Sequence, residues 1–235
     1  MIKYLFIDLD DTILDFHKAE RIALSKTLMH FGVEPTDDMC ELYSAINKAH
    51  WERLERKEIT RPQVLLGRFR EFFRQVGHEV DPKQVAAVYE ENLSQGHYFL
   101  PGAEETVKQL SNQYPLYLAS NGTSHVQAGR LKSAGIIPYF QEIFVSQDVG
   151  ADKPSPEYFK RCFAKIPGFR VEQSLMVGDS LTSDMRGGIG VGMQTCWVAP
   201  KERTAPADVT PDYRIESLAE LPALLDKMQK NEMGY

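Results

Sequence analysis

The sequence predicts an α/β protein with a Rossmann-like parallel sheet core and an inserted four-helix cap domain. Three observations predict it: short apolar runs alternate with amphipathic segments after residue 102, the first apolar run ends in an aspartate-rich turn, and the stretch between them has helical periodicity alone. The chain has 235 residues, 43% hydrophobic and 26% charged, which is the composition of a folded globular protein. This length suits one complete core with an appended subdomain.

The first element is the apolar run of residues 3–7, directly before Asp8. An apolar run that ends in turn residues is typical of a strand buried on both faces, as in a parallel sheet. The run is too short for the apolar region of a signal peptide, and no stretch of the chain reaches the ~18 apolar residues of a membrane-spanning helix. We therefore expect a cytoplasmic protein.

Four helices and no strand are expected between residues 16 and 97. The spacing of Ile22, Leu24 and Leu28 indicates the first helix. Each of the other three begins at a residue typical of a helix start, namely Thr36, Thr60 and Asp81. A proline lies just inside the last two of these helices, at Pro62 and Pro82. We expect these helices to form the cap domain, 16–97, inserted into a core domain of 1–15 and 98–235, with hinges near Phe16 and Tyr98.

Strands and helices alternate in the rest of the chain. Helices are predicted at 103–112, 124–134, 155–165, 182–189 and 217–229, and strands at 116–119, 143–146, 175–177 and 196–199. Such alternation predicts a parallel sheet with helices on both faces.

Chemically active side chains follow four of the predicted strands. In chain order they are Asp8, Asp10 and Asp11, then Ser120 and Asn121, then Asp148 and Lys153, and finally Asp179 with Asp184 one helical turn later. In an open parallel sheet, ligands bind at the carboxyl ends of the strands, so these residues should share one edge.

This set of side chains points to phosphate chemistry. Crowded carboxylates repel one another and need a cation, and oxygen ligands suit Mg²⁺, which binds through one or two carboxylates and a substrate phosphate. The amine of Lys153 and the hydroxyl of Ser120 would neutralise and orient the remaining phosphate oxygens. The sequence thus predicts phosphoryl transfer to a carboxylate nucleophile.

The same four motifs, at 8–12, 120–121, 153–154 and 178–184, resemble those of the haloacid dehalogenase-like (HAD) superfamily. The resemblance implies that Asp8 is the nucleophile and forms an aspartyl-phosphate, and that Asp10 is the acid and then the base. It also implies that Ser120, Asn121 and Lys153 bind the phosphoryl group. Mg²⁺ would be held by Asp8, the main-chain carbonyl of Asp10, and Asp179. Asp184 would bind the metal or its waters.

The cap stretch 45–60 and the segment 178–197 further resemble the YjjG/YfnB-type branch of pyrimidine 5′-nucleotidases. This resemblance implies a Mg²⁺-dependent phosphatase acting on a nucleoside 5′-monophosphate, pyrimidine or noncanonical. The alternatives are a phosphoglycolate or sugar-phosphate phosphatase, a phosphomutase and, outside enzymes, a phosphate-sensing module. In the superfamily an aspartate at position 10 argues against dehalogenases and cation pumps.

Other features of the sequence narrow the expected partners. The net charge of −6 argues against a nucleic-acid polymer or a membrane surface as a partner. The partner that the resemblance implies is a small phosphate monoester. The monomer and the homodimer both remain open.

The aromatic residues Trp51, Phe69, Phe72 and Phe73 are interpreted as cap core. The glycine-rich stretch 187–192 follows a predicted helix, so we interpret it as a helix end rather than a nucleotide-binding loop.

Overall fold

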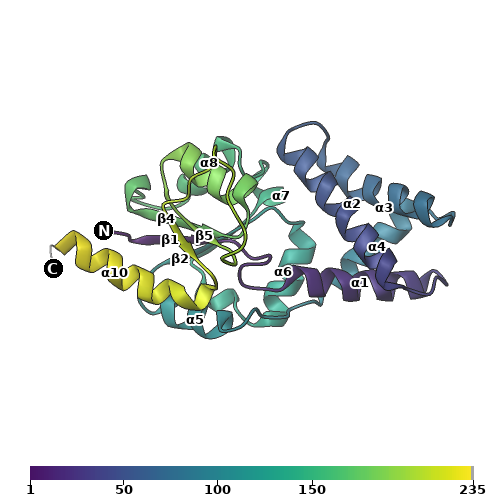
Figure 1. Ribbon diagram of the computed structural model, residues 1–235, viewed down its shortest axis with the longest axis horizontal. Helices are drawn as coiled ribbons and strands as arrows, with labels where there is room; N and C mark the ends of the chain where they lie inside the picture. Colours follow the sequence, from purple (N-terminus) through teal and green to yellow (C-terminus); the bar gives the residue numbers. More distant parts are fainter. Residues whose placement is uncertain (234–235) are drawn as a thin grey trace. The chain divides into compact units, whose positions relative to one another are not determined.

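The computed structural model describes residues 1–233, with side chains to 230, and contains the predicted parallel sheet (Figure 1). Its strand order is β3-β2-β1-β4-β5-β6, and every neighbouring pair is parallel. The strands are β1 (Tyr4–Ile7), β2 (Leu116–Ser120), β3 (Glu142–Val145), β4 (Ser174–Gly178), β5 (Gln194–Val198) and β6 (Tyr213–Ile215). The predicted fold class is confirmed, with β6 as an additional edge strand.

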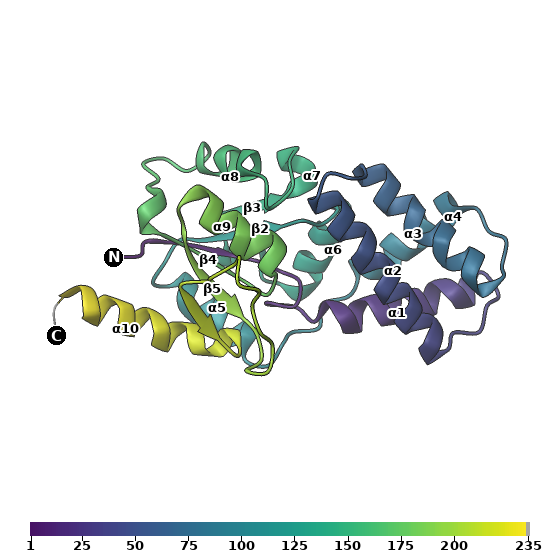
Figure 2. The same ribbon diagram turned by 45° about the horizontal axis from the view of Figure 1, so that its top comes forward.

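Helices cover both faces of the sheet within the first compact unit, which comprises Met1–Asp15, Phe99–Ser124 and the chain from Gly135 onward. Figures 1 and 2 show α8 and α9 over one face, and α5 and α10 over the other. The helices of this unit are α5 (Ala103–Ser111), α7 (Ser146–Val149), α8 (Pro156–Phe163), α9 (Arg186–Val191) and α10 (Leu221–Met233). Short helical turns lie at η1 (Ile137–Tyr139), η2 (Val171–Gln173), η3 (Leu181–Met185) and η4 (Leu218–Glu220).

Aromatic side chains fill the space between the sheet and α8. Phe6 on β1 stacks on Tyr117 of β2, with ring centroids 5.1 Å apart, and both belong to a cluster that includes Tyr158 and Phe159 of α8. Phe6 and Phe159 are fully buried. This packing fixes β1 at the centre of the sheet, which in turn fixes the position of the residue that follows it.

The second compact unit is helical and comprises Phe16–Tyr98 together with His125–Ala134. Its helices are α1 (Phe16–His30), α2 (Asp37–Glu55), α3 (Arg61–Val76), α4 (Pro82–Ser94) and α6 (Ser124–Ala134). Phe69, Phe72 and Phe73 lie in its core, as predicted, whereas Trp51 is only half-buried.

Helix α6 differs from its predicted place. The sequence assigns residues 124–134 to the α/β core, but the helix packs within the helical unit. The buried Arg130 donates from Nε to the main-chain oxygen of Gly96 over 2.9 Å, and a Cβ on Gly129 would lie 2.8 Å from the main-chain oxygen of Ser94. An amphipathic pattern shows that a helix buries one face, but not which neighbour covers it.

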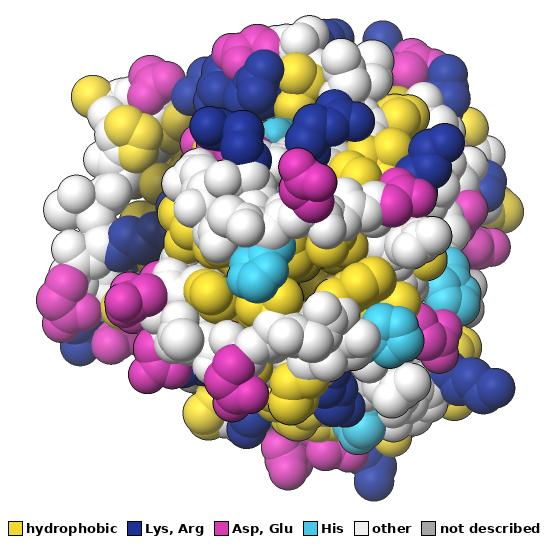
Figure 3. Space-filling view, turned by 90° about the vertical axis from the view of Figure 1, so that its right-hand side faces the viewer, with side chains coloured by type: hydrophobic (Ala, Val, Ile, Leu, Met, Phe, Trp, Pro, Cys, Tyr) yellow, Lys and Arg dark blue, Asp and Glu magenta, His cyan; other side chains and the backbone are white. Residues whose placement is uncertain are grey.

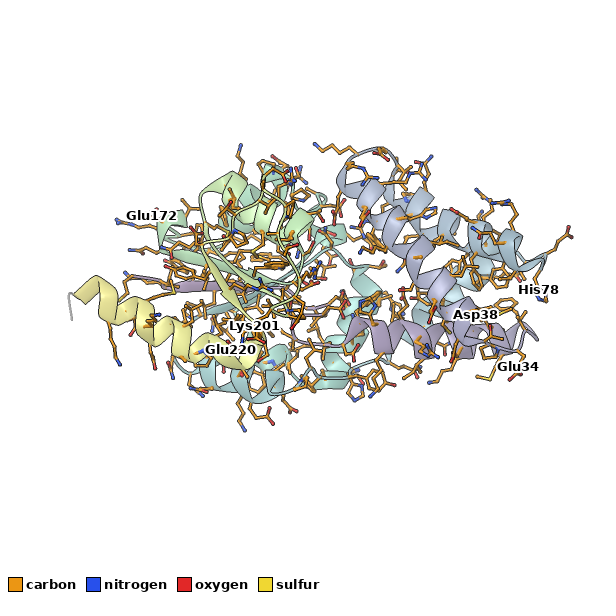
Figure 4. The ribbon with its side chains drawn as sticks, viewed as in Figure 1. Glu34, Asp38, His78, Glu172, Lys201 and Glu220 are labelled. Atoms are coloured by element: carbon orange, nitrogen blue, oxygen red, sulfur yellow. The ribbon has the colours of Figure 1, made fainter. Side chains whose placement is uncertain are left out.

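The surface of the helical unit carries both signs of charge with hydrophobic side chains between them (Figure 3). Glu34, Asp38 and His78 lie on or beside the loops that join α1 to α2 and α3 to α4 (Figure 4). In the part of the chain that the structure describes, no helix is both long and apolar enough to cross a lipid bilayer.

Candidate active site

The site lies at the carboxyl ends of the three central strands β2, β1 and β4, which are neighbours in the sheet. Asp8 directly follows β1, Ser120 is the last residue of β2, and Asp179 directly follows β4. The main-chain N–H of Asp8 donates to the carbonyl of Val177 over 2.9 Å, so the pairing of β1 with β4 extends to Asp8 itself. The sheet thus fixes the main chain of Asp8.

A tight turn follows Asp8. The N–H groups of Ile13 and Leu14 both donate to the carbonyl of Leu9, and the N–H of Asp11 donates to the carbonyl of Leu14. Asp11 has a φ of 55°, in the left-handed region that residues other than glycine seldom adopt. Because the turn is closed by these bonds, Asp10 is held half-buried beside Asp8.

Lys153 is the buried cation of the site, with 1% of its surface exposed. Its Nζ donates to Asp8 Oδ1 at 2.7 Å, to the carbonyl of Ala119 at 2.6 Å and to Asp184 Oδ1 at 2.5 Å. These three acceptors match the three N–H donors of an ammonium group. Lys153 therefore joins the ends of β1 and β2 to Asp184.

Asn121 holds the main chain of Lys153. Its Nδ2 donates to the carbonyl of Lys153, and its Oδ1 accepts from the N–H of Lys153, both over 2.8 Å. The amide is thus engaged by Lys153, which indicates a role in placing the lysine. Contact between Asn121 and a phosphate stays a prediction. Ser120 is buried, and its Oγ accepts from the N–H of Gly122 at 3.2 Å.

Asp184 is fully buried and reaches the site from the π-helical turn η3. Its Oδ2 accepts from the N–H of Ser180 at 3.1 Å, while its Oδ1 accepts from Lys153. A Cβ on Gly178 would lie 2.2 Å from Asp184 Oδ2, so position 178 must be glycine for this carboxylate to occupy its place.

Burial and mutual repulsion of the carboxylates dominate the electrostatics. Burial raises the pKa of Asp8 well above its usual value; Lys153 opposes the shift, and Asp184, Asp10 and Asp179 reinforce it. Burial, with Asp184 and Asp11, raises the pKa of Asp179 to about 8. Burial alone would lower the pKa of Lys153, but Asp184 and Asp8 outweigh it and raise that pKa. The lysine is therefore charged, and it offsets only part of the carboxylate charge.

The donor set fits a divalent metal ion. Asp8, Asp179 and Asp184 each offer a carboxylate oxygen, and these three atoms lie within 4.8 Å of one another. All-oxygen ligands are those that Mg²⁺ prefers. A dication here would relieve the repulsion that raises the pKa of Asp8 and Asp179.

The structure brings together Asp8, Lys153, Asp179 and Asp184, and it places Ser120 and Asn121 on the same edge of the sheet. Asp148 is exposed instead and accepts from the Ser124 hydroxyl at 2.6 Å.

Two neighbours of Asp179 were not predicted. The Trp197 indole donates to the carbonyl of Asp179 over 2.9 Å, and the Arg203 guanidinium lies 3.8 Å from Asp179 Oδ2. Nothing in the sequence pattern links Arg203, in the segment between β5 and β6, to an aspartate 24 residues earlier.

Similarity to known proteins agrees with this geometry. Residues 2–192 match the family model of haloacid dehalogenase-like hydrolases. The HAD-hydrolase YfnB of Bacillus subtilis is 39% identical over 94% of both chains. The pyrimidine 5′-nucleotidase PynA of Streptococcus pneumoniae is 36% identical over 96% of this chain and 95% of PynA. The pyrimidine 5′-nucleotidase YjjG of Escherichia coli is 29% identical over 95% of this chain and 98% of YjjG.

The crystal structure of YfnB, bound to magnesium, superposes with a TM-score of 0.91 at 38% identity and covers 96% of this chain and 99% of YfnB. These relatives confirm the resemblance predicted from the four motifs and from the YjjG/YfnB-type segments. The chain belongs to the haloacid dehalogenase-like hydrolase family.

Proposed function

We propose that the chain is a Mg²⁺-dependent phosphatase that hydrolyses a nucleoside 5′-monophosphate, pyrimidine or noncanonical, through an aspartyl-phosphate on Asp8. The observation that carries the proposal is the arrangement around Asp8, whose carboxylate lies against Lys153 and beside Asp179 and Asp184. The names of PynA and YjjG, similar over almost their whole length, support the substrate class.

In the first step of the proposed reaction, an Asp8 carboxylate oxygen attacks phosphorus, and the bond from phosphorus to the ester oxygen breaks. Asp10, held beside Asp8 by the turn, gives its proton to the leaving oxygen. In the second step a water molecule attacks the phosphorus of the acyl phosphate and loses its proton to Asp10. Inorganic phosphate leaves, and the carboxylate of Asp8 is restored.

The remaining residues stabilise charge. The Lys153 ammonium already binds Asp8, so it opposes the rise in the pKa of the nucleophile and can reach a phosphoryl oxygen attached to it. Ser120 would donate its hydroxyl to another phosphoryl oxygen. Mg²⁺, held by Asp8, the Asp10 carbonyl and Asp179, with Asp184 binding it or its waters, would supply charge neutralisation at the phosphoryl oxygens.

Release of inorganic phosphate tests the proposal. The panel is dUMP, dTMP, UMP, AMP, phosphoglycolate, glucose 1-phosphate and glucose 6-phosphate, each with Mg²⁺ and with EDTA. We expect fast, metal-dependent release from the pyrimidine monophosphates. Preference for phosphoglycolate or a sugar phosphate would contradict the nucleotidase assignment while leaving the chemistry of Asp8 intact.

Two aspartate variants test the nucleophile. Asp8→Asn should abolish turnover in a protein that still folds, because an amide does not attack phosphorus. Asp148→Asn is the matched control on the same edge of the sheet, because this exposed side chain lies outside the carboxylate cluster and can still accept from Ser124. It should retain full activity. Substantial turnover by Asp8→Asn would refute the proposed nucleophile.

A further inference from the structure

We propose that Trp197 and Arg203 are positioning residues that hold Asp179 in its metal-binding orientation and so set the affinity of the site for a divalent cation. This inference rests on the proposed function in one respect: it takes Asp179 to be a cation ligand.

Trp197 fixes the main chain of Asp179. It lies on β5, paired with Gly178 at the end of β4, and only 2% of its surface is exposed. Its Nε1 donates to the carbonyl of Asp179 over 2.9 Å. This bond ties the first residue after β4 to the neighbouring strand, at a point where the regular pairing of the two strands has ended.

Arg203 restrains the side chain of the same residue. Its Nη1 lies 3.4 Å from the Asp179 carbonyl oxygen and 3.8 Å from Asp179 Oδ2. The guanidinium therefore lies close to both the main chain and the carboxylate of Asp179. The guanidinium also lies over the Trp197 ring, 5.5 Å from its centroid. Trp197 and Arg203 therefore form one unit around Asp179.

The segment that carries Arg203 is itself fastened to the core. Arg214 lies over the same Trp197 ring at 4.8 Å and donates to the carbonyls of Ala199 and Pro200. Arg186 pairs with Asp208 at 2.7 Å. These contacts hold the main chain before and after position 203, so the main chain of Arg203 is fixed and its side chain is directed toward Asp179.

The expected effect follows from how metal sites are built. A carboxylate binds a metal most tightly when neighbouring groups already hold it in the binding orientation, and removing such a neighbour typically costs about 10- to 100-fold in affinity. The Asp179 side chain is 25% exposed, so removing these neighbours should let it leave the metal-binding orientation.

A pure charge effect of Arg203 has the opposite sign. An arginine near a cation site repels the cation, so removing only its charge would tighten metal binding. Arg203→Lys keeps the charge but loses the planar guanidinium, whose Nη1 lies near both Asp179 oxygens, whereas Arg203→Met loses the charge and the guanidinium. If Arg203 positions Asp179, both variants bind the metal more weakly.

The experiment measures Mn²⁺ binding to the full chain without substrate, by electron paramagnetic resonance of the free ion. The variants are Arg203→Lys, Arg203→Met, Trp197→Phe and Asp179→Asn. Lys201→Met is the matched control, because Lys201 lies in the same segment, carries the same charge and pairs with Glu216 at 2.7 Å (Figure 4 labels Lys201). Thermal melting verifies that each variant folds.

We expect the dissociation constant for Mn²⁺ to rise about tenfold in Arg203→Lys and Trp197→Phe and to stay at the wild-type value in Lys201→Met. In Arg203→Met the rise should be smaller, because loss of the positive charge offsets part of it. Phosphatase activity of Arg203→Lys should recover at high Mg²⁺ concentration, because the loss lies in metal affinity. If Trp197→Phe does not fold, the two arginine variants decide the outcome.

Unchanged Mn²⁺ affinity in both arginine variants would overturn the inference, and so would tighter binding by Arg203→Met with unchanged binding by Arg203→Lys. Asp179→Asn separates this failure from that of the proposed function. If this variant binds Mn²⁺ as well as the wild type, Asp179 is no ligand and the proposed metal site itself is wrong.

Discussion

The centre of the site is a lysine that is almost completely shielded from bulk water. Lys153 has all three of its N–H donors in hydrogen bonds, and two of the acceptors are carboxylates. A buried charge is tolerated when its partners are complete and becomes costly when one is removed. The groups that hold Lys153 in place should therefore matter for turnover as much as those that would touch the substrate.

Asn121→Ala tests this point. The substitution removes both hydrogen bonds to the main chain of Lys153, so we expect kcat for phosphate release to fall by about tenfold or more. Asn112→Ala, which removes a hydrogen bond to Lys108 at the end of α5, is the control and should leave kcat unchanged. Wild-type kcat in Asn121→Ala would show that Lys153 does not need this support.

Glu20 in the helical unit makes stability depend on pH. Its pKa is raised from 4.5 by burial, against the hydrogen bonds from Ser44 and Asn47 and the charges of His17 and Arg68. A carboxyl with a raised folded pKa stabilises the fold fully below its unfolded pKa, and this contribution is lost as the pH rises through the folded pKa.

Glu20→Gln should therefore gain stability relative to the wild type as the pH rises from 4.5 to 7. Urea unfolding at both pH values measures the difference. Glu34→Gln, on an exposed loop, is the control and should show the same difference from wild type at both pH values. A difference for Glu20→Gln that shrinks or stays constant as the pH rises would contradict this assignment.

Among single residues, the sequence predicts those whose role follows from their position directly after a strand. Asp8 and Asp179 are such residues, since each directly follows a strand of the central sheet. The roles of Asn121, Trp197 and Arg203 depend on partners 32, 18 and 24 residues away, which only the folded chain brings into contact.

Among the elements, α9 shows what the glycine-rich stretch does. A Cβ on Gly187 would lie 2.6 Å from the Phe159 ring, and one on Gly188 would lie 2.8 Å from Thr195. These two glycines let α9 approach α8 and β5 closely. Gly190 lies on the same helix, and nothing stands within 4 Å of its position for a Cβ. The interpretation of a helix and its end, rather than a nucleotide loop, agrees with this packing.

Gly187→Ala and Gly190→Ala form a matched pair on this helix. The first should destabilise the protein by about 1–3 kcal/mol, because the methyl group overlaps a buried ring. The second should stabilise it by up to about 1 kcal/mol, because alanine is the better helix former and the space is open. Chemical denaturation measures the free energy of unfolding of both variants. Equal effects would show that the Phe159 ring moves aside without loss of stability.

The start of η3 explains one error in the predicted elements. The sequence predicts one helix over 182–189, but the chain forms a π-helical turn before α9. The N–H groups of Asp184 and Met185 both donate to the carbonyl of Ser180. The wider turn brings the Asp184 carboxylate back to the N–H of Ser180, an arrangement that depends on Lys153 and Gly178 and is invisible in local periodicity.

The sequence does not predict strand β6, for a simpler reason. It has three residues, Tyr213–Ile215, of which only Ile215 is buried. So short a run carries no alternation from which a strand can be predicted. The interior strands β1, β2 and β4 were predicted because their residues are almost all buried and apolar.

For the whole molecule, metal binding and folding should be coupled. A cation that binds the folded site and not the unfolded chain stabilises the fold by about 2.7 kcal/mol at 100 times its dissociation constant. We expect Mg²⁺ to raise the melting temperature of the wild type by several degrees and to leave Asp179→Asn unchanged. An equal rise in both would place the bound metal elsewhere.

The helical unit consists of two separate stretches of the chain, Phe16–Tyr98 and His125–Ala134, which limits how it can be cut out or exchanged. Helix α6 follows β2 in the chain, yet Gly129, Arg130 and Val126 pack among α1, α4 and the segment after α4. A graft or deletion of residues 16–98 alone would separate these side chains from their partners. The remaining chain would carry Arg130 without the residues that bury it, and the segment 16–98 would lack the side chains that α6 packs against it. The transferable module is therefore discontinuous in the gene, and swapping the cap between relatives requires exchanging α6 with it.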